Sequence, residues 1–469
     1  MTVAITPPET TGPSASWAQE RRATIQLAGP MVLSLLGFLA MEIVDILMIG
    51  RLGEDPLAAV SLGVGIWYPL FLFGMAVVSM VAPLAAQAMG ARNLRQARRV
   101  LRQGLWVGLT ISVPMTVATL FMEEFLLLTG QEPRLAALAQ IYLTPMAFVF
   151  IPTVWWIALR CFMAALDVSR PAMWIVFGAV PLNAGLNYLL IYGSFGFPRL
   201  ELLGAGLATL GSEIAMLVAV IVYVSTARKF KRLHLFGRLW KTDWATYRRI
   251  FRIGLPAGGI AVMEATMFST VAILMGWFGA TALAVHLIAT QICTATFTVP
   301  MGLSQAAAVR IGQAAGRRDL AGVRRAGWTA FGLGWTFMAG GALVIFIFAQ
   351  DLIPLFVDEE PEKMAELVAL GESFLYVAVM FQLADAGQII AVSCLRGLND
   401  TVVPMIISFI GYWVFGLGSG CIFAFYLNFG GVGLWYGLLV GLSAATLLGV
   451  WRFHLLTRTP ELAFARIES

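Results

Sequence analysis

Two carboxylates interrupt the first long apolar run of the chain, residues 31–49. They are Glu42 and Asp45, three residues apart and therefore on one face if the run is helical. A run of this length crosses a bilayer as a helix, which takes about 20 residues. A carboxylate at the bilayer centre costs on the order of 2.5–3.5 kcal/mol on insertion scales, so such residues are rare and usually mark an ion or substrate path.

Two amides on a later apolar run match Asp45 in depth. Asn183 and Asn187 stand at i and i+4, on one helical face. Counted along helices from the start of each run, Asp45 lies about 22 Å deep and the amides about 18 and 24 Å. A carboxylate and two amide oxygens are hard donors, so the three side chains predict a site for a hard cation such as Na⁺. The alternative is a hydrogen-bond clamp between two helices, a common use of Asn in membranes.

A second pair of acids lies in the later part of the sequence. Glu264 and Asp385 each lie about 15 Å from one end of an apolar run, close to the bilayer midplane. Two carboxylates at one depth predict a second candidate site for Na⁺ or another cation. The alternative is that a separate structural partner neutralises each acid. Neither apolar run contains a Lys or Arg that would serve as this partner.

Five further residues are weaker candidates for lining a cavity between the spans: Glu42, Glu213, His286, Tyr376 and Trp67. Glu42 shares a face with the aspartate of its own run, and Glu213 lies in mid-span with no identified partner. His286 is more typical of a satisfied interior histidine than of a ligand. The faces of Tyr376 and Trp67 would attract organic cations, although aromatic residues in apolar runs usually serve packing.

The composition is that of a polytopic membrane protein. The chain has 469 residues, 59% hydrophobic and 12% charged, with a mean hydropathy of +0.83. A soluble globular protein carries about 25% charged residues. The pI of 9.1 would fit a nucleic-acid partner, but the basic residues lie in loops, so we expect the lipid bilayer and no nucleic acid. The four cysteines lack metal-ligand spacing and are expected as buried thiols.

Apolar runs separated by charged or Gly/Pro breaks predict an all-α fold of twelve transmembrane helices. Their approximate limits are 27–50, 57–85, 103–122, 135–160, 171–193, 203–226, 254–277, 281–308, 327–349, 367–395, 402–426 and 430–452.

The chain repeats itself from Pro30 onward, because Pro256 begins a second copy in unbroken register. Identical pairs include Met41 and Met267, Gly50 and Gly276, Gln87 and Gln313, Arg92 and Arg318, and Arg98 and Arg324. Two halves of one ancestral fold are therefore predicted, each a six-helix bundle. With six spans per half the repeats are parallel, related by a pseudo-two-fold along the membrane normal. The two prolines are expected to open their spans, in the first helical turn.

Loop charges set the expected orientation. Basic residues gather before the first span, in loops 2–3 and 8–9 and in the linker, whereas acids gather in alternate loops at Glu123, Glu124, Asp358, Glu359, Glu360 and Glu362. By the positive-inside rule both termini are cytoplasmic. We expect a monomer in a bacterial inner membrane. The expected parts are a cytoplasmic N-terminal tail, a first bundle, a basic cytoplasmic linker, a second bundle and a cytoplasmic C-terminal tail: 1–26, 27–226, 227–252, 253–452 and 453–469.

Several motifs resemble the multidrug and toxic compound extrusion (MATE) family, and the acids resemble its NorM-type branch. The motifs are VDILMIGRLG at 44–53, QAMGARNLRQA at 87–97, PLNAGLNYLLIYG at 181–193, LGAGLAT at 203–209, FQLADAGQ at 381–388 and CLRGLNDTVVP at 394–404. The resemblance implies a secondary active efflux transporter. Such a protein exports organic cations or amphipathic drugs in exchange for Na⁺ or H⁺ by alternating access. It also implies cation binding by acids in the matching motifs, with a hydroxyl from Thr209.

Two other functions fit the sequence less well. A lipid-linked glycan flippase of the same superfamily would be expected to carry basic residues inside the spans, where this chain carries mostly acids. A membrane enzyme would need a nucleophile–base pair or a metal-ligand cluster, and the sequence has no HExxH and no GxSxG, so we expect no enzyme and no cofactor beyond the coupling ion. Clustered amide oxygens favour Na⁺, whereas lone buried carboxylates would equally carry H⁺.

Overall fold

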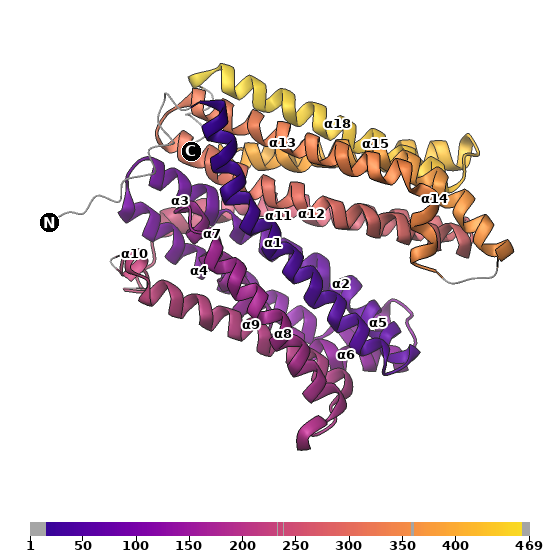
Figure 1. Ribbon diagram of the computed structural model, residues 1–469. Coiled ribbons are helices and arrows are strands. Elements are labelled where there is room, and N and C mark those ends of the chain that lie inside the picture. The colour runs from indigo at the N-terminus through magenta and orange to yellow at the C-terminus, as the bar shows by residue number, and fades with distance from the viewer. Residues whose placement is uncertain (1–15, 232, 238, 358–360, 462–469) are drawn as a thin grey trace. The chain divides into compact units, whose positions relative to one another are not determined.

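The computed structural model describes residues 16–231, 233–237, 239–357 and 361–461, and every regular element in these ranges is helical (Figure 1). Eleven helices are long and apolar enough to cross a membrane, and one bent pair makes a twelfth. The predicted all-α, twelve-span fold is thereby confirmed. The bent pair, at 45°, forms the fourth span, which was expected at residues 135–160.

The helices of the first repeat are α1 (Trp17–Gly50), α2 (Glu54–Ser79), α3 (Val81–Gly90), α4 (Leu94–Leu120), α5 (Met122–Leu128), α6 (Pro133–Met146), α7 (Phe150–Ala165), α8 (Arg170–Tyr192) and α9 (Glu201–Thr226). After the short helix α10 (Arg228–Lys231), the second repeat contains α11 (Trp244–Gly276), α12 (Ala280–Gly316), α13 (Leu320–Ile347), α14 (Ala349–Leu352), α15 (Pro361–Gly397), α16 (Val402–Phe409), α17 (Ser419–Cys421) and α18 (Gly431–Arg458). Two π-helical stretches, Ile410–Gly418 and Ile422–Tyr426, flank α17.

The first helix of each repeat begins earlier than its apolar run. α1 begins at Trp17 and α11 at Trp244, so Pro30 and Pro256 lie inside helices rather than in the first turn. The expectation that these prolines open their spans was wrong. An apolar run measures only the part of a helix that crosses lipid, and here each helix continues into a more polar segment before it. An interior proline still removes one hydrogen bond from the helix ladder.

The chain divides into two compact units whose boundaries fall inside α1 and α11. One unit contains residues 33–261, and the other contains residues 1–32 and 262–469. The leading turns of α1 therefore pack with the helices of the second repeat. The leading part of α11 packs with the helices of the first repeat. Both boundaries follow closely after the paired prolines, Pro30 and Pro256.

A buried ion pair holds the start of α1 within its unit. Arg310 on α12 donates from Nε to Glu20 Oε1 at 2.8 Å and from Nη2 to Glu20 Oε2 at 2.7 Å. Each residue is only 4% exposed, and a further nitrogen of Arg310 donates to Gln313 Oε1 at 3.3 Å. The equivalent positions of the other repeat hold Thr246 and Leu84, so this ion pair has no copy there.

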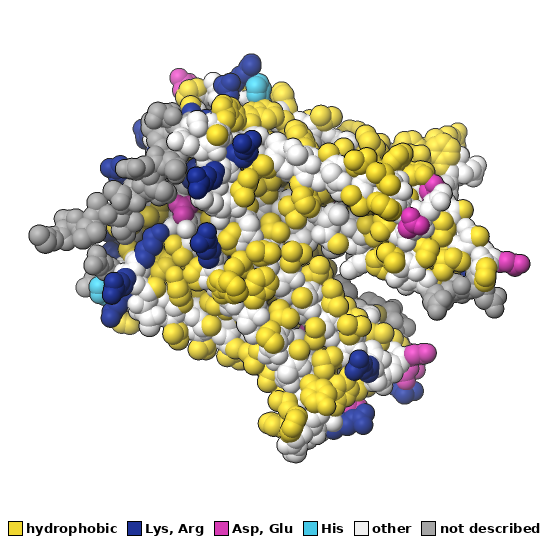
Figure 2. All heavy atoms as spheres, in the orientation of Figure 1, with side chains coloured by type: hydrophobic (Ala, Val, Ile, Leu, Met, Phe, Trp, Pro, Cys, Tyr) yellow, Lys and Arg dark blue, Asp and Glu magenta, His cyan; other side chains and the backbone are white. Residues whose placement is uncertain are grey.

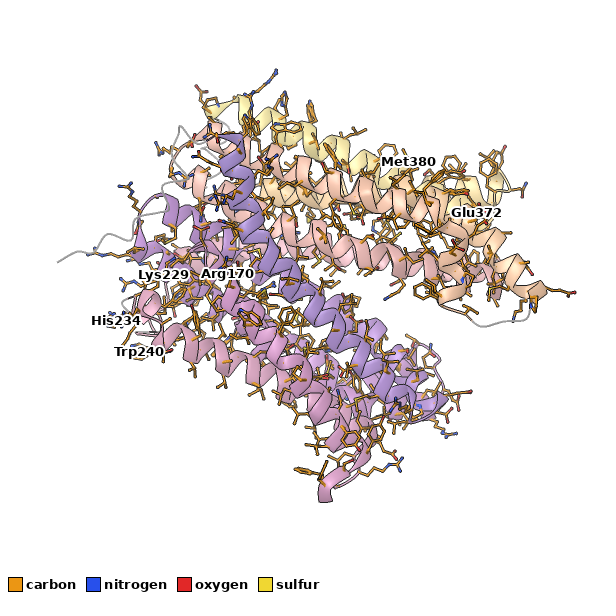
Figure 3. The ribbon with its side chains drawn as sticks, viewed as in Figure 1. Arg170, Lys229, His234, Trp240, Glu372 and Met380 are labelled. Carbon is orange, nitrogen blue, oxygen red and sulfur yellow. The ribbon has the colours of Figure 1, made fainter. Side chains whose placement is uncertain are left out.

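The segment before α11 is held against α4 by hydrogen bonds from arginine side chains to backbone carbonyls. Arg98 donates to the carbonyl of Leu233 at 3.1 Å, and Arg102 to that of Leu235 at 2.9 Å. Lys229 on α10 donates to the carbonyl of Leu166, at the end of α7. In Figure 3 Arg170, Lys229, His234 and Trp240 lie at one end of this unit, so the linker and the α7–α8 turn share a side.

Exposed side chains along the helices are largely apolar. Figure 2 shows hydrophobic side chains over much of the visible helix surface. They include residues more than half exposed on several spans, such as Leu47, Trp174, Val218, Ile273 and Leu447. Large apolar side chains in water would be unfavourable, whereas lipid accepts them, so the chain is a multi-pass membrane protein. Of the four cysteines, all free, Cys421 is partly exposed and the other three are buried as expected.

Some of the sequence-based predictions fall on residues outside the described ranges. These are the first part of the expected N-terminal tail, the end of the C-terminal tail, two linker arginines and three acids of one expected outer loop: residues 1–15 and 462–469, with Arg232, Arg238, Asp358, Glu359 and Glu360.

Removing one partner of the Glu20–Arg310 pair should destabilise the fold strongly, because the other charge would be left buried and unpaired. We expect Arg310→Met to lower the unfolding free energy by about 3–5 kcal/mol in detergent micelles. The matched control is Arg134→Met. Arg134 pairs with Asp55 at 2.6 Å, but both side chains are more than half exposed, so a loss of at most about 1 kcal/mol is expected. Equal losses for the two variants would contradict this interpretation.

Candidate cation sites

One polar cluster joins three helices of the unit formed by residues 33–261. Asn187 on α8 donates from Nδ2 to Asp45 Oδ1 on α1 at 2.5 Å, and to Asn183 Oδ1 at 3.2 Å. The hydroxyl of Thr209 on α9 lies 3.3 Å from Asp45 Oδ2 and 3.2 Å from the carbonyl oxygen of Ala205. The structure thus brings together all four residues predicted for the first site.

Helix packing explains how these side chains reach one another. Asn183 and Asn187 lie one turn apart on α8, and both are fully buried. α9 approaches α8 closely at Gly204, where an added Cβ would lie 2.5 Å from the carbonyl oxygen of Leu190. Any larger residue at Gly204 would clash with the α8 backbone and force α8 and α9 apart. The site therefore depends on one small residue as well as on its polar groups.

The amide of Asn187 presents its nitrogen to the carboxylate, because that nitrogen lies between two acceptor oxygens. A flipped amide would set its oxygen against those of Asp45 and Asn183. In the described residues Asn187 Oδ1 is buried without a hydrogen-bond partner. As it stands, the cluster stabilises a negative charge on Asp45 through donors. Na⁺ would find oxygens of Asp45, Asn183 and Thr209 as they stand, and the oxygen of Asn187 only after its amide turned, whereas H⁺ would bind Asp45 directly.

Two residues interact electrostatically with Asp45. Glu42 lies one turn earlier on α1 and is exposed. Tyr142 on α6 is buried and faces both acids, and it lies within reach of Thr209. Sequence reasoning missed Tyr142. The sequence gave only a weak signal for it, since Tyr142 is the only tyrosine within the fourth predicted span.

The second cluster lies in the other unit, around α15. Asp385 is buried, its Oδ1 has no hydrogen-bond partner among the described residues, and it interacts electrostatically with half-buried Glu264 on α11. Tyr412 lies within hydrogen-bonding reach of Glu264 and accepts a hydrogen bond from Gln388. The predicted pairing of the two acids is therefore supported by their proximity. Gln388, three residues after Asp385 on one face of α15, was missed although its spacing was a usable signal.

A basic residue does serve this second cluster, contrary to the expectation from the sequence. Arg396 lies at the end of α15 and interacts electrostatically with Glu264. The sequence did not indicate Arg396 as a partner because this residue lies just beyond the apolar run that contains Asp385. Because Glu264 has this counter-charge, Asp385 is the more weakly compensated acid of the pair.

The remaining candidates have varied surroundings. His286 is buried edge-on against Trp435, with ring centroids 5.7 Å apart. Trp67 is buried and stacks on Phe71 with centroids 4.8 Å apart. Both arrangements are typical of packing.

Two further candidates differ in exposure. Tyr376 is exposed, and its hydroxyl donates to Glu372 one turn earlier on α15, the acid labelled in Figure 3. Glu213 on α9 is buried. No group of three His, Cys, Asp or Glu side chains suited to a metal ion occurs in the described part of the chain.

A family model, MatE, matches the chain twice, over residues 30–189 and 256–422. The chain belongs to the MatE family. The two matches begin at Pro30 and Pro256, where the internal repeat begins, so the predicted repeat of the sequence is confirmed.

Curated MatE relatives cover nearly the whole chain. It is 44% identical over 443 residues to a protein named probable multidrug resistance protein NorM of Mesorhizobium japonicum, covering 94% of this chain and 95% of that protein. It is also 44% identical over 445 residues to the protein of the same name in Rhodopseudomonas palustris, covering 95% and 94%. The predicted NorM-type branch is confirmed.

Solved structures share the fold. The eukaryotic MATE transporter AtDTX14 superposes with a TM-score of 0.85 at 19% identity, covering 96% of this chain and 99% of that one. An outward-facing multidrug resistance MATE family transporter gives 0.85 at 20% identity, covering 94% and 96%. Membership of a transporter family confirms the expectation that the chain is not an enzyme.

If the Asp45 cluster binds Na⁺, Na⁺ will stabilise the folded protein. A ligand at a hundredfold its Kd adds about 2.7 kcal/mol to the unfolding free energy. We expect the unfolding temperature of the purified protein to rise with NaCl relative to choline chloride. Asn187→Leu should reduce the rise and Asp45→Asn should abolish it. Tyr188→Leu, at the exposed neighbour of Asn187 on α8, should keep it. No rise in the unaltered protein would contradict a sodium site at this cluster.

Proposed function

We propose that the chain is a secondary active multidrug efflux transporter. It exports organic cations or amphipathic drugs, and inward movement of Na⁺ or H⁺ supplies the energy through alternating access. The observation that carries the proposal is a cluster of acids within the spans of each unit, with Asp45 in one and Asp385 in the other. The names of the bacterial relatives support the same substrate class.

A carboxylate in such a cavity couples two movements because a cation and a cationic drug compete for it, or bind it in different access states. One positive charge moving inward gains about 2.3 kcal/mol per 100 mV of membrane potential. Either Na⁺ or H⁺ would therefore drive export. The lipid-linked glycan flippase is not favoured by a specific observation. Buried Arg310 is fully engaged with Glu20, and Arg396 lies beside Glu264, so neither is available to hold a pyrophosphate.

The direct test is dye movement in liposomes that contain the purified protein. We expect an opposing Na⁺ or pH gradient, imposed separately, to drive a fluorescent cationic dye against its own gradient. A Na⁺ gradient at equal internal and external pH isolates the sodium contribution. Liposomes that move no dye under either gradient would refute the proposed function.

Neutral replacements at the second cluster should uncouple export without unfolding the protein. We expect Asp385→Asn and Glu264→Gln each to reduce gradient-driven dye export to near the protein-free background, because the amide keeps the shape but removes the charge. Glu366→Gln, an exposed acid on the same helix α15, is the matched control and should transport normally. Unfolding temperatures should stay close to that of the unaltered protein. Normal export by both variants would show that these acids are structural.

The cytoplasmic orientation of the linker is also part of the proposal, together with a location in the bacterial inner membrane. Phe195, between α8 and α9, and Trp240, in the linker, are 89% and 76% exposed. In a background without native cysteines, Phe195→Cys should react with an impermeant maleimide from outside intact cells. Trp240→Cys should react only after the membrane is opened. The reverse pattern would invert the topology.

A further inference from the structure

The linker before α11 forms a hairpin along the first turns of α4. On the first leg of this hairpin, the carbonyl of Leu233 accepts a hydrogen bond from Arg98 at 3.1 Å. Two turns further along α4, the indole Nε1 of Trp106 donates to the carbonyl of Leu239 at 2.8 Å. As the linker advances between these contacts, it therefore approaches the apolar part of α4.

The second leg returns along the same helix. Gln103 Nε2 donates to the carbonyl of Lys241 at 3.3 Å, and Arg99 Nη1 lies 3.4 Å from Asp243 Oδ2. These partners on α4 step back toward the start of the helix while the linker moves forward in sequence. The hairpin therefore turns at Trp240, which is its tip.

The tip lies where α4 passes from basic to apolar residues. Arg102 is the last of the arginines on the first turns of α4, and Trp106, to which Leu239 is bound, lies one turn beyond it. Trp240 is 76% exposed, at the end of the unit marked in Figure 3. Tryptophan is enriched at the membrane–water interface, where its apolar ring and its N–H group each find suitable neighbours. The exposed ring at the tip is therefore suited to the headgroup level of a bilayer.

The charge of the hairpin is basic where it is exposed. Lys241 directly follows the tip and is exposed, and the Arg99 side chain is 59% exposed. Asp243 is the only acid in the linker sequence, and it is occupied by Arg99 and by the hydroxyl of Thr246 at 3.2 Å. Arg98 donates to a linker carbonyl and so fixes the hairpin. The hairpin thus presents positive charge beside an exposed aromatic ring.

An anionic phospholipid complements both features, because its phosphate accepts the charge while its headgroup region accepts the ring. Basic segments next to a membrane span attract anionic lipids, and each Lys or Arg near the surface contributes. We propose that this hairpin binds an anionic phospholipid, with Trp240 among the headgroups and Lys241 beside the lipid phosphate. The inference rests on the proposed function only for the cytoplasmic leaflet, because lipid binding is measurable without transport.

Lipid titration of the purified full-length protein tests the site. A fluorophore is attached at Thr242→Cys, an exposed position beside the tip, after the native cysteines have been replaced. We expect short-chain phosphatidylglycerol to saturate the signal at a concentration at least about fivefold below that of phosphatidylcholine, the factor that one basic residue contributes. Salt should weaken the response to phosphatidylglycerol.

Three results of this titration would overturn the proposal. The first is saturation by both lipids at one concentration, which would show no preference for an anionic lipid. The second is saturation by inorganic phosphate at the concentration of phosphatidylglycerol, which would indicate a general anion site. The third is stronger binding of a short RNA than of phosphatidylglycerol, which would indicate a nucleic-acid surface.

Variants then assign the binding to the hairpin. Lys241→Gln should raise the half-saturating concentration of phosphatidylglycerol about fivefold, whereas Arg51→Gln, at an exposed cation of the α1–α2 turn, should leave it unchanged. Trp240→Ser should weaken the response to both lipids, and Trp174→Ser, at an exposed tryptophan of α8, should not. Trp106→Phe keeps an aromatic ring but removes the donor that fixes the tip, so it should also weaken binding.

Unchanged lipid binding in both Lys241→Gln and Trp240→Ser would place the lipid elsewhere and refute the proposed site. All the altered side chains of the hairpin are exposed, so these variants should fold with unfolding temperatures close to that of the unaltered protein. If the unaltered protein moves no dye in liposomes, the proposed function fails, yet the lipid titration still decides whether the hairpin binds an anionic phospholipid.

Discussion

A charge inside a lipid bilayer is tolerated only where neighbouring helices supply hydrogen-bond partners for it. The contact of Asn187 with Asp45 is the clearest example in this chain, because it joins α8 to α1 deep in a unit whose outer faces are apolar. The arrangement demands that α8 and α9 pack closely, which Gly204 permits. It also demands that the two asparagines share one face of α8. The packing of the helices and the hydrogen bonds of the site therefore depend on each other, since a shift of α8 or α9 would remove a donor from the Asp45 carboxylate.

The two repeats meet this constraint with different residues. Asp45 corresponds to Val271 in the second repeat, and Glu264 corresponds to Phe38 in the first. The scaffold has been retained while the acids have moved: Glu264 lies on α11, the counterpart of α1, but seven residues earlier, and Asp385 lies on α15. The second unit builds its cluster from α11, α15 and the π-helical stretch that carries Tyr412, and it adds a nearby cation in Arg396. Because the electrostatic surroundings differ, the two acid clusters are not copies of one site.

The sequence was sufficient for features that follow from composition and spacing. Apolar runs revealed the spans, and matched prolines and arginines revealed the repeat. The i, i+4 spacing placed Asn183 and Asn187 on one face, and the depth count brought Asp45 to their level. The sequence did not predict contacts between helices that are distant in the chain, or the parts of a helix that extend beyond its apolar run. Tyr142 approaches Asp45 from another span, and Gln388 lies three residues after Asp385 on the same helix, a spacing that was overlooked. Arg396 lies just beyond the apolar run that contains Asp385. Glu20 and Arg310 are far apart in the sequence, and no local sequence pattern predicts their contact.

The buried polar groups of this protein differ in how completely they are partnered. Arg310 and Glu20 meet through two hydrogen bonds, and a third group of Arg310 is bound to Gln313. A pair so completely satisfied gains nothing by binding an ion. Asp385, Asn187 and Glu213 instead each retain a buried oxygen without a hydrogen-bond partner in the described residues. Leaving such an oxygen unpaired costs about 1–3 kcal/mol. A proton or a cation bound at such an oxygen would offset this cost, which is the property that the proposed ion-coupled cycle requires.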